Sequence, residues 1–419
     1  MKTVVATVTP ARAAAANRRG GLGIALYEGG NEKLAGVGHP LREAAKAHLP
    51  SPPSVRAWDF LSFALAVFAT DRLLLRSSGP DGWTRQISLE VDLADPEPWN
   101  ALAERIAATL RFLTGDTWQV KFRGGGSRPP TWHPKFSDRD CVCLFSGGLD
   151  SFIGAADLIE AGRTPLLVSQ VSPKEGQTQE YLARQLGLDQ NRFEGKAIER
   201  HAPPYEPSSR SRSILFLGYG IIAASALQKS GKPTELFLPE NGLISINPPF
   251  SRRRLGSLST RTTHPYFIGE LQRLVSALGL NVQFVNPYRG KTKGEMIEGC
   301  KSQTVKKIAH STYSCGKGKR LNQHCGRCVP CLIRRAAFSH AKLQDKTNYW
   351  ANDLRLHGTN DDVFASRLAV AQLQSRNVDR WTSEAGPLPY DIAERALYVE
   401  VVRRGLEELR AFLGLVQWP

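Results

Sequence analysis

The sequence lacks an apolar run long enough to cross a bilayer. The longest candidate, residues 60–75, is interrupted by Ser62 and by two charged residues near its end, and it is shorter than the roughly 20 apolar residues that a spanning helix needs. The N-terminus also lacks a signal-peptide core, because Pro10 and Arg12 stop the chain before an apolar segment develops. We therefore expect a cytoplasmic protein with no membrane association.

A disulfide framework is missing too. The 419 residues include seven cysteines, and three of them, Cys325, Cys328 and Cys331, crowd into one short segment. This spacing is too tight for conventional disulfides and is typical of metal ligation in a reducing compartment. No long stretch suggests disorder, and no internal repeat is visible.

The composition is that of a folded protein with an excess of positive charge. Hydrophobic residues make up 41% and charged residues 22%, which are ordinary globular values, and the length predicts two or three domains. The formal net charge of +16 suits polyanionic partners such as nucleotides, RNA or DNA, although a basic balance alone can reflect the host proteome. We expect a nucleotide partner, with nucleic acid as an alternative that we do not favour.

The first part of the chain, residues 1–135, is predicted to be an α+β accessory domain. Its expected elements are strands over 1–8 and 84–91 and helices over 59–75 and 98–114. The stretch from Gly124 to Pro130 then predicts a linker, because glycine is permissive and paired prolines bar regular structure.

Residues 136–345 change to alternating strands and helices. The expected strands are 141–145, 165–171, 235–238 and 281–285, and the expected helices are 151–160, 178–188, 212–228 and 264–278. This rhythm predicts an α/β fold with a doubly wound parallel sheet. Residues 346–419 are expected to form a helical extension, whose amphipathic helix over 392–412 packs onto the core.

The sharpest motif lies between the first strand and the first helix of this central region. It consists of Ser146, Gly147, Gly148, Leu149, Asp150 and Ser151. Adjacent glycines let the backbone approach a phosphate, and their N–H groups, the helix N-terminus and the serine hydroxyls can donate to an anion. A carboxylate beside a phosphate is repulsive unless a cation intervenes, so we assign Asp150 to Mg²⁺ coordination or to positioning around the metal. The alternative is a glycine-rich turn with Asp150 or Ser151 as the helix N-cap.

The second motif is a set of four cysteines. Cys315, together with Cys325, Cys328 and Cys331, supplies enough thiolates for a closed tetrahedral Zn²⁺ site of structural role. The alternatives are an iron–sulfur cluster on the same thiolates, His324 in place of one cysteine, and unligated cysteines packed on a helix. The remaining cysteines are expected to be small buried hydrophobic residues: Cys141, Cys143 and Cys300.

The hexapeptide 146–151 resembles the signature of the PP-loop ATP pyrophosphatases, a family that splits ATP into AMP and pyrophosphate. The resemblance implies that ATP adenylates a carboxylate or carbonyl oxygen, which an amine or sulfur nucleophile then attacks. It also implies that Ser146, Asp150 and Ser151 act in catalysis while the whole motif binds ATP. Activation is needed because a carboxylate oxygen leaves poorly, whereas AMP leaves readily.

The central region further resembles the 7-cyano-7-deazaguanine synthases, the QueC family. The cysteine segment 312–334 and the stretches Arg212–Leu217 and Lys291–Ile297 carry this resemblance. It implies that the carboxylate of 7-carboxy-7-deazaguanine is adenylated and then attacked by an amine, giving an amide and, in the family's own reaction, a nitrile. Arg212 and Lys293 would neutralise phosphates; without the resemblance, both are ordinary surface charges.

Departures from the QueC pattern leave the substrate open. About 135 residues precede the core and about 75 follow it. The family's Gly-Tyr-Pro-Asp-Cys-Arg stretch, associated with the base-binding region, is replaced by a basic, proline-rich sequence over 247–254. Ser213 stands where the family has Asn after its arginine.

The added length resembles that of QueC-like proteins of bacterial anti-phage operons, the Qat type and type IV CBASS. That resemblance implies transfer of the deazaguanine to an amine of a partner protein encoded in the same operon. A macromolecular nucleophile needs a docking surface, which the added domains would supply. The alternatives are a tRNA-modifying PP-loop enzyme and a non-catalytic scaffold subunit whose PP-loop senses ATP.

Overall fold

The structure is a computed structural model of the chain. It describes residues 1–171, 175–197, 204–207, 209–228, 231–251, 261–317, 323–355 and 362–416. Arg252, Arg253 and Arg254 of the predicted basic stretch lie outside the described residues. Within the described part, no helix combines the length and the apolar character needed to span a bilayer.

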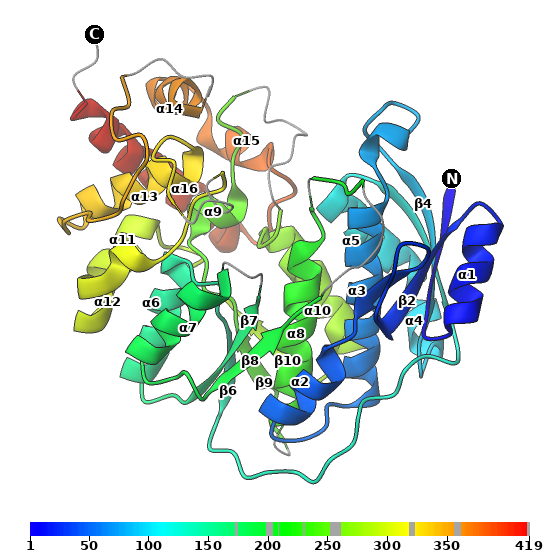
Figure 1. Ribbon diagram of the computed structural model, residues 1–419. Coiled ribbons are helices and arrows are strands. Elements are labelled where there is room, and N and C mark those ends of the chain that lie inside the picture. The colour runs from blue at the N-terminus through cyan, green and yellow to red at the C-terminus, as the bar shows by residue number, and fades with distance from the viewer. Residues whose placement is uncertain are drawn as a thin grey trace.

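Two sheets of five strands each form the framework (Figure 1). The first contains β1 (Lys2–Thr7), β2 (Leu22–Glu28), β3 (Ala35–Gly38), β4 (Gln86–Asp92) and β5 (Thr117–Arg123). The second contains β6 (Cys141–Leu144), β7 (Pro165–Gln170), β8 (Arg192–Gly195), β9 (Thr234–Phe237) and β10 (Val282–Val285). The strand orders are β3-β2-β1-β4-β5 and β10-β9-β6-β7-β8.

All neighbouring strands in these two sheets pair in parallel, which confirms the predicted α/β fold class. The first sheet differs from the α+β module expected for it, because parallel strands need crossover connections and helices supply them. These helices are α1 (Pro10–Arg18), α2 (Leu41–His48), α3 (Val55–Leu73), α4 (Glu97–Ala101) and α5 (Ala103–Thr114).

Helix α3 joins the two sheets into one core. It is buried on nearly every face, as its almost wholly apolar sequence requires, and it packs against α8 (Arg212–Leu227) of the second sheet. Gly218 lets these helices approach closely, since a Cβ there would lie 3.1 Å from Cβ of Ala64. One continuous cluster of buried side chains contains residues of both sheets. The domain limits at residues 135 and 345 therefore stay predictions.

The stretch 124–140, which the structure describes in full, contains neither helix nor strand, as its glycines and prolines predicted. Ser127 anchors it to the N-terminal unit. Its hydroxyl accepts hydrogen bonds from the indole N–H of Trp58 at 3.1 Å and from Arg42 at 2.6 Å.

The helices of the second sheet and of the C-terminal part follow in chain order. They are α6 (Leu149–Glu160), α7 (Glu175–Gln185), α9 (Gly242–Ile246), α10 (Pro265–Ala277), α11 (Lys293–Gly299), α12 (Gln303–Ile308), α13 (Val329–His340), α14 (Asp362–Ala371), α15 (Val378–Ser383) and α16 (Ile392–Gly414). The predicted amphipathic helix is α16, and it packs against α9 and α13. Figure 1 shows α14, α15 and α16 together on the side of the second sheet away from α1, which confirms the helical extension.

Candidate active site

The hexapeptide 146–151 forms the turn between β6 and α6. Gly147 has φ +79°, a left-handed conformation that favours glycine, and a Cβ there would lie 3.1 Å from Cγ of Gln179. A Cβ on Gly148 would lie 3.3 Å from the carbonyl oxygen of Tyr313. The tight turn and the neighbouring chain therefore account for both glycines.

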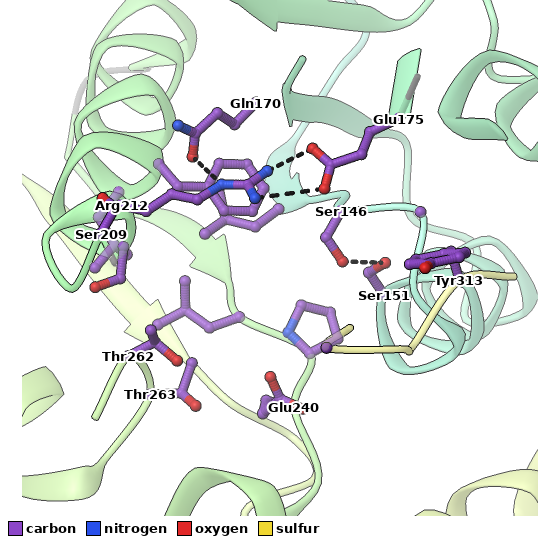
Figure 2. A pocket seen from close by; sticks show the side chains of 18 of the residues that line it. Ser146, Ser151, Gln170, Glu175, Ser209, Arg212, Glu240, Thr262, Thr263 and Tyr313 are labelled. Carbon is purple, nitrogen blue, oxygen red and sulfur yellow. Dashed lines mark hydrogen bonds and ion pairs between the residues drawn. The ribbon is translucent and has the colours of Figure 1, made fainter. Parts of the chain in front are cut away.

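The serine hydroxyls of this turn face each other in a cavity (Figure 2). Ser146 Oγ and Ser151 Oγ are 3.2 Å apart, and both residues line the cavity. Ser151 Oγ donates to the carbonyl of Gly148 at 3.0 Å, and the N–H of Gly148 donates to Ser146 Oγ at 3.3 Å. Leu149 is buried in the core beneath them. Hydroxyls and glycine N–H groups thus gather at the start of α6, where an anion is favoured.

Asp150 lies behind the turn and is 5% exposed. Its Oδ1 accepts from Nζ of Lys293, and its Oδ2 accepts from the backbone N–H and the side-chain amide of Asn241 at 3.1 and 2.6 Å. Burial alone would raise the pKa of Asp150, but Lys293 and the hydrogen bonds lower the pKa overall. Asp150 and Lys293 form a buried ion pair, set back from the side chains that line the cavity.

Glu240 supplies a carboxyl group on the cavity side of this ion pair. Burial and the neighbouring carboxylate of Asp150 raise the pKa of Glu240 well above its ordinary value. A hard divalent cation takes carboxylate oxygens and would relieve the repulsion between two such groups. By ligand type, Glu240 therefore fits Mg²⁺, whereas both oxygens of Asp150 are already bound by Lys293 and Asn241.

Sequence reasoning missed Glu240 and Asn241. Both follow β9, which lies next to β6 in the sheet. The strand order changes direction at this pair of strands, and ligands of doubly wound sheets bind beyond the carboxyl ends of strands at that point. The short segment after the predicted strand 235–238 was therefore the signal that could have found them.

Arg212 lines the cavity at the start of α8. Its Nη2 pairs with Oε2 of Glu175 at 2.6 Å, and its Nε donates to Gln170 at 3.4 Å, as Figure 2 shows. Its side chain is 39% exposed, so the guanidinium can reach a ligand from the wall. The structure brings Arg212 to the same cavity as Ser146 and Ser151, whereas Lys293 acts on this cavity only through Asp150.

The cavity has a volume of about 630 Å³, and its lining contains both polar and apolar side chains. Thr262 and Thr263 lie across it from Ser146 (Figure 2). Within the described residues, three hydroxyls of the cavity lining are buried without a hydrogen-bond partner: Ser209, Ser213 and Thr263. Phe216 and Ile268 add apolar surface to the lining. Buried polar atoms are rarely left unsatisfied, so these hydroxyls point to a bound polar ligand or ordered water.

The four predicted cysteines come together as a buried cluster. Their sulfur atoms lie within 4.8 Å of one another, with 3.8 Å between Cys315 and Cys328 and 3.9 Å between Cys325 and Cys331. Four thiolates at about 2.3 Å from a tetrahedral zinc have nearly this spacing, so the cluster fits a structural zinc ion. His324 is not part of it, because its Nε2 accepts from the N–H of Ser314 at 3.1 Å.

The cysteine cluster is connected directly to the glycine turn. Tyr313, two residues before Cys315, donates its backbone N–H to the carbonyl of Gly147 at 2.9 Å and lines the cavity. A metal ion on the cysteines would therefore stiffen the segment that lies over the turn.

Comparison with known proteins finds similarity over one stretch of the chain. The family described as Queuosine biosynthesis protein QueC matches residues 263–342. The 7-cyano-7-deazaguanine synthase 1 of Mesorhizobium japonicum is 37% identical over 78 residues, which are 18% of this chain and 32% of that protein. The 7-cyano-7-deazaguanine synthase of Brucella ovis is 39% identical over 70 residues, 16% of this chain and 28% of that protein. No solved structure matches the chain significantly.

The chain thus spans about a third of the length of the curated relatives that it matches. The matched family stretch contains Lys293 and the four clustered cysteines, and the hexapeptide 146–151 precedes it. Over residues 263–342, at low identity, the chain is similar to the QueC proteins.

Proposed function

We propose that this chain is a PP-loop enzyme that uses ATP to adenylate the carboxylate of 7-carboxy-7-deazaguanine and then forms a C–N bond with an amine. The observation that carries the proposal is the placement of the turn 146–151, Arg212 and Glu240 around one cavity of about 630 Å³. That volume lies in the range of small-molecule sites. The similarity of residues 263–342 to 7-cyano-7-deazaguanine synthases supports the deazaguanine as substrate.

We assign the residues around the cavity the following roles. The N–H groups of Gly147 and Gly148 and the hydroxyls of Ser146 and Ser151 hold the phosphates of ATP. A carboxylate oxygen of the substrate attacks the α-phosphorus, the bond to the β-phosphate oxygen breaks, and pyrophosphate leaves. The amine then attacks the acyl carbon, AMP departs with the former carboxylate oxygen, and the nitrogen loses a proton. Arg212 stabilises the negative charge that develops at the cavity wall.

Two metals fit the residues present. Glu240 would hold Mg²⁺, with Asp150 behind it helping to position the metal, and Mg²⁺ when bound supplies positive charge to the phosphates. Lys293 holds the Asp150 carboxylate in place and in its ionised form. The four cysteines would hold a zinc ion of structural role.

Several other residues of the cavity lining suit a flat, polar heterocycle. The hydroxyls of Ser209, Ser213 and Thr263 can each donate and accept a hydrogen bond, and Phe216 and Ile268 offer apolar contact. A deazaguanine presents both donors and acceptors on its edges, so it would satisfy these hydroxyls.

We further propose that the amine belongs to a partner protein encoded in the same operon, and that the reaction serves anti-phage defence. This extends the resemblance to the Qat and type IV CBASS proteins. The support is the size of the added parts, which flank the cavity-bearing sheet on both sides (Figure 1). Mass spectrometry of the purified operon partner after incubation with enzyme, ATP and the acid tests this step. An added deazaguanine is expected, whereas an unmodified partner beside free nitrile would contradict it.

Pyrophosphate release tests the core activity. The intact, zinc-loaded chain should release pyrophosphate from Mg-ATP in the presence of 7-carboxy-7-deazaguanine, and Ser146→Ala should lower the rate by roughly 100- to 1,000-fold. Acid-independent release in both proteins would contradict adenylation.

A tRNA-modifying enzyme is the second candidate because of the +16 charge, and it predicts salt-sensitive tRNA binding. A scaffold that only senses ATP predicts nucleotide binding without release.

A further inference from the structure

The C-terminal helix α16 lies behind the buried ion pair of the site rather than at the cavity itself. Its Glu408 is 8% exposed and faces the start of α11. There, the Thr292 hydroxyl donates to Oε1 of Glu408, and the Gly294 N–H donates to Oε2 at 3.3 Å. Thr292 and Gly294 are the two sequence neighbours of Lys293, so one carboxylate binds a side-chain hydroxyl on one side, and a backbone N–H on the other side, of the lysine that pairs with Asp150.

The local sequence is fitted to this contact. A Cβ on Gly294 would lie 2.6 Å from Oε1 of Glu408, so a larger residue there would displace the Glu408 carboxylate from this contact. Thr292 is also the N-cap of α11 and forms a capping box with Glu295. The first N–H groups of a helix have no partner within the helix, and here Glu408 satisfies one of them.

A second contact on the same face of α16 reinforces the first. Arg404, one turn before Glu408, pairs through Nε with Oε1 of Glu295 at 2.5 Å and donates through Nη2 to the carbonyl of Gly290 at 2.8 Å. The start of α11 is therefore held by a carboxylate and a guanidinium from one helix.

The same helix also lies against the other partner of Asp150. Asn241 caps α9 and binds Asp150. The next residue, Gly242, approaches α16 so closely that a Cβ would lie 2.6 Å from Cγ1 of Val401. Both segments that hold Asp150, one carrying Lys293 and the other Asn241, are thus packed on α16.

We infer that α16 is a positioning element of the active site and that Glu408 is a positioning residue that sets Lys293 against Asp150. The inference rests on the proposed function for its kinetic consequence alone. Glu408 does not line the cavity, so it acts through α11 and not on the substrate. The C-terminal extension, which the shorter QueC pattern lacks, then serves the chemistry itself.

Lysine labelling tests the geometry without any catalytic assay. Lys293 Nζ is paired and its side chain is only 7% exposed, so an acetylating reagent should modify it slowly in the wild-type chain. Glu408→Gln should raise its labelling rate, measured by mass spectrometry, at least several-fold. The matched control is Glu407→Gln, an exposed neighbour on the same helix, which should leave the rate unchanged. Arg404→Gln removes the second contact from a side chain that is 38% exposed, and should give a smaller increase.

Kinetics then test the consequence. Glu408→Gln should lower kcat for pyrophosphate release by roughly 10- to 100-fold, the scale of a misplaced catalytic group, with KM for ATP nearly unchanged. In a Lys293→Ala background, Glu408→Gln should cause no further loss, because both changes act through one group.

Unchanged Lys293 labelling in folded Glu408→Gln and Arg404→Gln variants would overturn the inference, as would independent, additive losses in the double variant. If Glu408→Gln does not fold, the Arg404→Gln labelling decides. A wild-type chain that releases no pyrophosphate would refute the proposed function, while the labelling result would still decide the positioning role.

Discussion

At the scale of single residues, the proposed nucleotide site depends on the glycine turn 146–151. Gly147 and Gly162 both have left-handed φ, +79° and +74°, so alanine at either position should cost about 1–2 kcal/mol of the free energy of unfolding. Gly147 lines the cavity, whereas nothing lies within 4 Å of a Cβ on Gly162. We predict that Gly147→Ala abolishes Mg-ATP binding in calorimetry and Gly162→Ala does not. Equal affinities would show that the turn does not hold the phosphates.

Removing an unpaired hydroxyl from the cavity lining should affect stability and substrate binding in opposite directions. Thr263 Oγ1 is buried with no partner among the described residues, so Thr263→Val should leave the melting temperature unchanged or raise it. If the hydroxyl meets the heterocycle, KM for 7-carboxy-7-deazaguanine should rise by roughly tenfold, the value of one hydrogen bond to a neutral group. A lower melting temperature with an unchanged KM would assign the hydroxyl to the fold instead.

At the scale of elements, the start of α8 depends on a carboxylate from the N-terminal unit. Oδ2 of the fully buried Asp71 in α3 accepts from the N–H of Arg210 at 2.8 Å and from the N–H and hydroxyl of Ser211 at 2.9 and 2.8 Å. Arg212, the next residue, lines the cavity. Helix α3 thus helps to fix one wall of the site.

Asp71→Asn should therefore weaken both the fold and the site. Breaking a buried ionic network costs about 3–5 kcal/mol, so the denaturant midpoint should fall clearly, and KM for ATP should rise because Arg212 is no longer held. Asp81→Asn, at an exposed carboxylate of the same unit, is the matched control for both measurements. An Asp71→Asn chain with lower stability and an unchanged KM for ATP would show that the Asp71 network stabilises the fold but does not position Arg212.

The elements of the second sheet were predictable because their signals are local. Residues 141–145 form a continuous apolar run, residues 165–171 are mostly apolar, and the adjacent glycines of 146–151 indicate a turn. The α1–β3 region was missed, because α1 is rich in alanine with little amphipathic pattern and β3 is four residues long. The contacts of Asp150 with Lys293 and Asn241 could not be predicted, since these residues come from elements far apart in the sequence. The same holds for the contacts of Glu408 with Thr292 and Gly294.

At the scale of the whole molecule, the two sheets have the same topology. In chain order, both run third, second, first, fourth, fifth. The point where the order reverses in the first sheet lies between β1 and β4, and there Arg12 of α1 pairs with Glu90 and Asp92 of β4. The side chains of the protein thus occupy this point, whereas the second sheet presents the turn 146–151 at the equivalent point. We therefore expect the chain to bind one nucleotide, at the second sheet.

The cysteine cluster links the stability of the whole chain to its site. We predict one zinc ion per chain by metal analysis, and Cys328→Ser should lower both zinc content and the melting temperature. Because Tyr313 bonds to Gly147, chelation of the metal should also weaken Mg-ATP binding. Cys300→Ser, at a buried cysteine outside the cluster, should keep the zinc. Full zinc content in Cys328→Ser would contradict the four-thiolate site.

The transfer of oxygen tests the central claim most directly. The chain is incubated with Mg-ATP, an amine and 7-carboxy-7-deazaguanine whose carboxylate carries ¹⁸O, and the nucleotide products are measured by mass spectrometry. Adenylation of the acid predicts AMP that carries one ¹⁸O atom from the carboxylate. Unlabelled AMP, or ADP as the product, would contradict the account.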